Sequence, residues 1–171
     1  ALTTMIVYSQ PVNEDMGWLI ADNLAAKSRA EKSSSVFIIK HQLVKSYARE
    51  YPDKVPGQLA RQFEAQGYVL LRISEISIPE FDDSQTRFTQ TASVPVNRSS
   101  YIKVQVAIHD LMDTIFWSEV VVFQDTENYF YYASAGTDPQ QLFRRHEEEL
   151  QVLIDGISDR IADIISKITF Q

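Results

Sequence analysis

The sequence predicts an α/β (α+β) protein with a mixed β-sheet and a long amphipathic C-terminal helix packed on that sheet. Strand and helix patterns alternate along the first half of the chain. Two adjacent strand patterns near residue 112 predict an antiparallel hairpin. Isoleucine and leucine then recur at spacings of three and four beyond residue 150. The predicted order is β-α-β-α-β-β-β-α, in one globular domain over residues 1–171.

The first three elements are a strand, a helix and a strand. Residues 5–8 form a short apolar burst that stops at a Ser-Gln-Pro turn cluster. A helix follows through Ala30, with Asn13 as its predicted N-cap and two acidic residues in its first turn. Residues 36–39 are continuously apolar, which predicts an interior strand covered on both faces.

Two short helices are predicted between residues 43 and 66, because two prolines divide that segment. The second should end at Gly67, as a left-handed C-cap. The next strand, residues 68–78, changes the phase of its apolar alternation near Ser74 and Glu75, which predicts a bulge.

Residues 79–97 are polar and show no period, so we expect a long loop. Residues 101–111 alternate strictly between apolar and polar, and a short reversal leads into a second strand over residues 114–124. The closing helix is expected over residues 139–168, with Asp138 as its cap and proline in its first position.

Composition excludes several classes of function. The 23 acidic side chains exceed the 16 basic ones and give a formal charge of −7, which repels nucleic acid. Cysteine is absent, and the five glycines form no phosphate-binding loop. No apolar stretch reaches the roughly 20 residues of a membrane-spanning helix. We therefore expect no nucleic-acid partner, no nucleotide or other cofactor and no membrane span.

No catalytic or metal-binding residues are predicted. His41, His109 and His146 fall on separate elements without a metal-ligand spacing. His109 and Asp110 are neighbours on a strand and point to opposite faces, so they do not form a dyad. The glutamates at 147–149 spread around a helix and are expected to form a solvated face.

Several residue strings resemble the domain shared by bacterial envelope lipoproteins, namely the curli-secretion protein CsgG, the penicillin-binding-protein activator LpoB and the amino-terminal domain of TolB. The strings are residues 59–63 leading into 67–76, residues 101–110 followed by 114–118, and residues 143–145 leading into the closing helix. The lipopolysaccharide-transport lipoprotein LptE and the auxiliary lipoproteins of lipid-transport ABC systems are similar alternatives.

This resemblance implies a periplasmic domain anchored to the outer membrane, with a lipid-bearing cysteine before residue 1. It implies binding of envelope proteins and no catalysis. The leading hypothesis is thus a non-enzymatic accessory or scaffold domain in envelope assembly or transport. Three alternatives remain: an LptE-like component of lipopolysaccharide transport, an enzyme whose site lies in the 79–97 loop, and a homo-oligomer held by the closing helix.

Four consecutive aromatic residues, Tyr129, Phe130, Tyr131 and Tyr132, follow the predicted hairpin. On an extended chain they point alternately to two faces, so both pairs cannot share one core face. One interpretation is that the rings cover the closing helix while the hydroxyls reach solvent. The other is that the outward pair anchors a partner protein, since aromatic residues are enriched at interface centres.

Overall fold

The computed structural model describes residues 3–31, 36–78, 93–132 and 139–167, and confirms the predicted order of elements. The five strands pair in the order β2-β1-β3-β4-β5. Strand β1 is parallel to β2 and β3, while β4 is antiparallel to both β3 and β5. The elements are β1 (Thr3–Ser9), α1 (Glu14–Ala30), β2 (Val36–Ile38), α2 (His41–Glu50), α3 (Pro56–Gln62), β3 (Gly67–Ser77), β4 (Ser93–Asp110), β5 (Ile115–Tyr132) and α5 (Pro139–Lys167).

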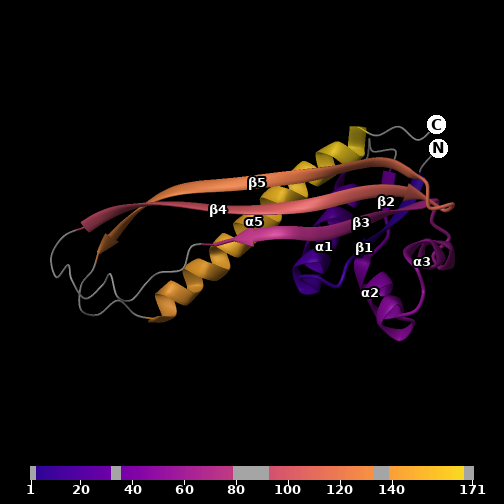
Figure 1. The fold of residues 1–171 in the computed structure, drawn as a ribbon, viewed down its shortest axis with the longest axis horizontal. Coiled ribbons are helices and arrows are strands. Elements are labelled where there is room, and N and C mark those ends of the chain that lie inside the picture. Colours follow the sequence, from indigo (N-terminus) through magenta and orange to yellow (C-terminus); the bar gives the residue numbers. More distant parts are fainter. Residues whose placement is uncertain (1–2, 32–35, 79–92, 133–138, 168–171) are drawn as a thin grey trace.

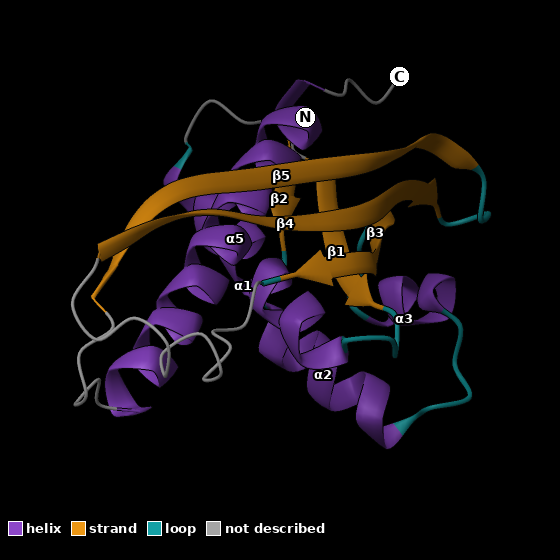
Figure 2. Ribbon diagram, turned by 60° about the vertical axis from the view of Figure 1, so that its left-hand side comes forward, coloured by secondary structure: helices purple, strands orange, loops and turns teal. Residues whose placement is uncertain are grey.

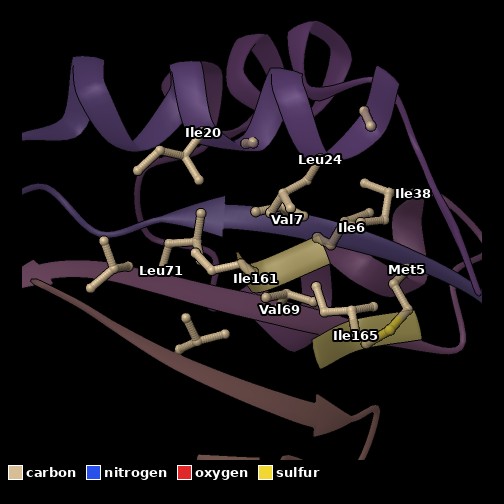
Figure 3. Close-up of a cluster of buried hydrophobic side chains, with 14 of the residues drawn as sticks. Met5, Ile6, Val7, Ile20, Leu24, Ile38, Val69, Leu71, Ile161 and Ile165 are labelled. Carbon is tan, nitrogen blue, oxygen red and sulfur yellow. The ribbon is translucent and has the colours of Figure 1, made fainter. Parts of the chain in front are cut away.

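Helices cover both faces of the sheet at β1. Met5, Ile6 and Val7 are all buried although neighbouring residues of a strand point to opposite faces. Helices α1 and α5 pack together on the face of Met5 and Val7, where Figure 3 shows their isoleucines and leucines beside the strands. Helices α2 and α3 pack on β1 and β3, on the face of Ile6 and Tyr68. The core is therefore two layers deep around β1 and β3.

Helix α5 packs on the sheet, as the sequence predicts. Its buried positions recur at spacings of three and four and face β4, β5 and α1. They are Leu153, Ile154, Ile157, Ser158, Ile161 and Ile165. The predicted cap Asp138 lies outside the described residues.

The predicted bulge in β3 is confirmed. The register with β4 shifts between Ile73 and Glu75, which leaves Ser74 as an extra residue. The Ser74 hydroxyl donates a hydrogen bond to the carbonyl of Lys103, 3.1 Å away. Because of this extra residue, Glu75 lies on the same face of the sheet as Arg72.

The prediction that residues 36–39 form an interior strand is wrong. Strand β2 has only three residues and lies at the edge of the sheet, next to β1. Val36 and Ile38 face α1 and are buried, whereas Phe37 between them is half-buried. A short apolar run therefore marks an edge strand here, because one helix covers a single face of it.

The two helix caps also differ from prediction. Asn13 adopts a left-handed conformation, with φ 53°, and its side chain makes no capping hydrogen bond, because a side-chain cap needs an extended N-cap residue. Helix α3 ends at Gln62, and the left-handed residue after it is Glu64, with φ 55°. Gly67 instead opens β3, where a Cβ atom would lie 2.5 Å from the backbone oxygen of His109. That close approach of two strands explains the glycine.

The hairpin of β4 and β5 is longer than predicted. Strand β4 begins at Ser93, so the expectation of a loop is wrong for residues 93–97, and residues 79–92 lie outside the described chain. Strand β5 continues to Tyr132, where it pairs with Ser93. Residues 93–100 show no sustained apolar alternation, so their assignment to a strand rests on their pairing with β5. Figure 1 shows this part of the hairpin extending beyond β1, β2 and β3, and in Figure 2 the hairpin lies above α2 and α3.

Candidate interaction surface

One face of β4 and β5 carries no helix among the described residues. Helix α5 covers the other face of these strands, and α2 and α3 lie over β1 and β3. The side chains of β5 on the uncovered face are therefore exposed: Phe116 by 50%, Val120 by 51% and Val122 by 37%. We call this surface of β3, β4 and β5 the open sheet face.

A bulge extends the apolar row toward the hairpin turn. The register of β4 and β5 shifts between Ile108 and His109, so that Trp117 pairs with Ile108 and Ile115 pairs with His109. Phe116 is the extra residue. Ile115 and Phe116 are both exposed, as is Met112 in the turn itself. Exposed apolar side chains thus extend from Val122 to the end of the sheet, with Ser118 between Val120 and Phe116.

The hairpin turn that carries Met112 is held in place from two sides. The Asp110 carboxylate accepts hydrogen bonds from the backbone amides of Met112, at 2.9 Å, and Thr114, at 2.8 Å. Asp113, in a left-handed conformation with φ 61°, accepts a hydrogen bond from the Tyr68 hydroxyl. Burial and this carboxylate raise the pKa of Tyr68 well above its ordinary value. The turn is therefore ordered before any partner binds.

Helix α3 fixes the same turn. The Arg61 guanidinium donates a hydrogen bond to the carbonyl of Leu111, at 2.8 Å. A Cβ atom on Gly57, in the first turn of α3, would lie 2.8 Å from the Asp113 carboxylate. Glycine therefore allows α3 to approach the turn closely.

The open sheet face also carries charge. Lys103 forms an ion pair with Glu75 at 3.3 Å and lies 5.5 Å from the centre of the Tyr101 ring. The Tyr101 hydroxyl donates a hydrogen bond to Glu75, and this bond together with the one from Lys103 lowers the pKa of Glu75. Arg72 is exposed, and no carboxylate among the described residues pairs with it. This face is therefore apolar and basic within an acidic chain.

Helix α5 protects the free edge of β5. The Arg160 guanidinium donates a hydrogen bond to the carbonyl of Val122 and lies 5.4 Å from the centre of the Phe123 ring. Gly156 leaves room for that ring, since a Cβ atom there would lie 2.3 Å from it. Strand addition along β5 is thereby obstructed at Val122, whereas the open sheet face of the same strand stays accessible.

The structure places the predicted aromatic segment on the same strand as the exposed row. The backbone of Tyr129–Tyr132 pairs with residues 93–96 of β4. The side chains of Tyr129, Phe130, Tyr131 and Tyr132 lie outside what the structure describes. Their role in binding a partner stays a prediction.

Sequence reasoning missed the row of Phe116, Val120 and Val122. The signal was present, because residues 120–122 are three consecutive valines in a hairpin strand. Alternate residues of such a strand point to opposite faces. Both faces therefore carry valine, whereas the absence of a covering helix on one of them, within the described chain, follows only from where α2 and α3 lie.

The described residues contain no group of three or more histidine, aspartate or glutamate side chains that could hold a metal. His41 pairs with Asp22 at 2.9 Å, and the buried His109 stacks on Tyr68 with ring centres 4.6 Å apart. The side chain of His146 lies outside the described part of the chain. The two described imidazoles thus sit on separate elements.

The predicted solvated face of the glutamates at 147–149 needs one correction. Glu147 and Glu148 are exposed, but Glu149 is buried and accepts a hydrogen bond from the Ser100 hydroxyl at 3.2 Å. Successive helix residues point about 100° apart, so one of the three must face β4.

No helix among the described residues is both long and apolar enough to cross a membrane.

No protein-family model and no curated protein matches the chain. The resemblance to the CsgG, LpoB and TolB family therefore stays a prediction. Solved structures of bacterial proteins match this chain over nearly its whole length, at low sequence identity.

Three of these structures illustrate the likeness. The hypothetical protein CT253 from Chlamydia trachomatis is 15% identical, with a TM-score of 0.49, covering 96% of this chain and 98% of that one. Lipoprotein GNA1162 from Neisseria meningitidis is 11% identical, with a TM-score of 0.49, covering 94% and 99%. The PelC dodecamer from Paraburkholderia phytofirmans is 12% identical, with a TM-score of 0.45, covering 98% and 89%.

Proposed function

We propose that this chain is a non-enzymatic accessory domain that binds partner proteins through the open sheet face. The observation that carries the proposal is the exposed row of Phe116, Val120 and Val122 on a strand whose other face packs against α5 at Val121 and Phe123. Contiguous exposed apolar patches on folded proteins mark interaction sites.

The surroundings of this row suit a protein partner. Apolar side chains lie at its centre, while Arg72, Gln105, Lys103 and Glu75 form a polar margin. This is the arrangement typical of protein interfaces, which combine an apolar core with a polar rim. The row lies on paired strands and ends at an anchored turn, so binding costs little ordering entropy.

The cellular setting is part of the same proposal. The resemblance to envelope lipoproteins supports a periplasmic domain tethered to the outer membrane by a lipidated cysteine that precedes residue 1. In that setting the open sheet face would dock a subunit of an envelope assembly or transport system. The acidic net charge of −7 argues against nucleic acid as the ligand.

A crosslinking experiment tests the proposal. A photoreactive amino acid at Val120 should crosslink to a discrete envelope protein in living cells, and one at Val152 should not. Both valines are exposed, by 51% and 41%, but Val152 lies on the outer surface of α5. Val120→Lys should abolish crosslinking from a probe at Phe116, with Val152→Lys as the matched control. Equal crosslinking from the Val120 and Val152 probes would contradict the proposal.

A further inference from the structure

We infer that the open sheet face receives the outer stripe of helix α1 from a second copy of this chain, in a head-to-tail contact. The inference rests on the proposed function, because it names an occupant for the same face. Three observations carry it: the exposed residues of α1, the unpaired charges on both surfaces, and the position of these surfaces on opposite sides of the sheet.

The outer side of α1 is a stripe of apolar and acidic residues. Asp15, Leu19, Asp22 and Ala26 recur at spacings of three and four along α1 and are all exposed. Val12, in the turn just before the helix, is exposed as well. Val12 is 55% exposed and Leu19 is 47% exposed. Large apolar side chains at these positions contribute nothing to the core of their own chain. We call these five residues the α1 stripe.

The α1 stripe and the open sheet face are complementary in charge. Asp15 is exposed and forms no ion pair within the described chain, and the same holds for Arg72 on the open sheet face. Asp22 differs, because His41 of the same chain pairs with it. A contact that sets Asp15 against Arg72 gives each charge the partner it lacks.

The two surfaces also agree in dimensions. Arg72, Gln105 and Val120 form one row across β3, β4 and β5. Neighbouring strands lie about 4.8 Å apart, so this row is about 10 Å long. A helix rises about 1.5 Å per residue, which puts Leu19 about 6 Å beyond Asp15. With Asp15 over Arg72, a helix lying across the strands places Leu19 between β4 and β5, beside Val120.

A single chain cannot make this contact with itself. Helix α1 packs on the face of Val7, whereas Arg72 and Val120 lie on the other face of the sheet. Each copy therefore presents one stripe and one open face, and both remain available when the other is used. A contact of this kind joins copies head to tail into a ring or a chain.

A face-to-face dimer of two open sheet faces fits less well. It would bring two copies of Arg72 and two of Lys103 together, and the acidic residue Glu75 is already paired within each copy. Like charges placed across an interface oppose association. Such a dimer would also leave Val12 and Leu19 exposed.

Solution mass measured by light scattering over a range of concentrations tests the inference. The unaltered chain should form assemblies larger than a monomer. Arg72→Asp and Asp15→Arg should each weaken association at least about tenfold. The two changes combined in one chain should restore it, because Arg and Asp have then exchanged places. Arg49→Asp, a charge reversal at an exposed position of α2, is the matched control.

A mixing experiment establishes the head-to-tail geometry. Leu19→Lys destroys the stripe and leaves the open face, whereas Val120→Lys does the reverse. Each variant alone should be monomeric, and an equimolar mixture should form dimers and nothing larger. Leu43→Lys, at an exposed leucine of α2, is the control and should assemble normally. Melting temperatures of all variants verify that they are folded.

Several results would overturn the inference. They are a chain that stays monomeric at millimolar concentration, assembly that survives Arg72→Asp, and a Leu19→Lys variant that still dimerises. The last result would indicate the face-to-face dimer. Leu19→Lys keeps the open sheet face but cannot occupy that of another copy, so a probe at Val120 in this variant should crosslink to the envelope partner and no longer to a second copy. The proposed function can therefore stand when self-association fails. If a folded Leu19→Lys variant lost the crosslink to the envelope partner, partner binding and self-association would not be separate properties of the chain.

Discussion

The Tyr68 hydroxyl lies 2.7 Å from the Asp113 carboxylate oxygen and joins the start of β3 to the turn between β4 and β5. The two residues are 45 positions apart in the chain. Through this bond the central strand positions the end of the open sheet face.

Tyr68→Phe should destabilise the fold by about 1–2 kcal/mol, because a hydrogen bond to a charged group is lost and the carboxylate keeps no replacement from β3. Urea denaturation measures the change. Tyr51→Phe is the control, since Tyr51 is exposed and caps the C-terminal end of α2. Equal stability of the two variants would show that this bond does not hold the turn.

The pKa of Glu75 should be below the ordinary glutamate value, because Tyr101 and Lys103 donate hydrogen bonds to its carboxylate. A depressed pKa in the folded state gives stability that is present above the unfolded value of about 4.3 and is lost as the pH falls through the folded value. An NMR titration of the Glu75 side chain measures the midpoint. Tyr101→Phe should move that midpoint upward, and an unchanged midpoint would refute the assigned cause.

Ile161→Asp should cost about 3–5 kcal/mol, because it buries an unpaired charge between α5 and the sheet. Ile161 has no exposed surface. For a domain of this size the melting temperature should fall by roughly 10 °C. Val152→Asp on the exposed side of the same helix should have little effect. A melting temperature that Ile161→Asp leaves unchanged would mean that α5 is not part of the core.

Gly67→Ala should destabilise the protein even though alanine normally loses less entropy than glycine. The added methyl group would meet the backbone oxygen of His109 at 2.5 Å, and neither strand can move without breaking its ladder. Gly156→Ala meets the outer end of the Phe123 ring instead, which can turn away. Thermal unfolding should therefore rank Gly67→Ala as the more damaging change.

The aromatic segment at the end of β5 has its own test. Tyr129 and Tyr131 are replaced with serine in one variant, and Phe130 and Tyr132 in another, so that each variant changes one alternate pair of the segment. If this segment anchors a partner, one pair should reduce crosslinking from Val120 without lowering the melting temperature. Loss of stability in both pairs, with binding retained, would assign the rings a structural role.

Elements with a period of their own were predictable from the sequence. Residues 101–111 alternate strictly, and the isoleucines of α5 recur at helical spacing, so each pattern reports the face that the element buries. The bulge at Ser74 was visible as a change of phase. These features depend on local residues alone, and the structure confirms them.

Features that depend on a distant segment were not predictable. Residues 93–97 are in a strand because β5 pairs with them, and the alternation of Val94 and Val96 is too short a signal, beside Pro95, to predict it. Gly67 was assigned to a helix end because the sequence pattern before it indicates a helix. No pattern in the sequence indicates that the backbone of His109 lies against Gly67. The open sheet face is of the same kind, since its exposure follows from where α2 and α3 lie.

The contact between Arg160 and Val122 also bears on how the protein remains in solution at high concentration. An unguarded edge strand with consecutive valines is a template for amyloid, in which copies add along the hydrogen-bonding direction. The guanidinium occupies an acceptor that the first added strand would need. Strand addition at Val122 therefore requires that Arg160 first release this carbonyl. One arginine on the helix that follows β5 thus opposes misassembly at this point of the edge.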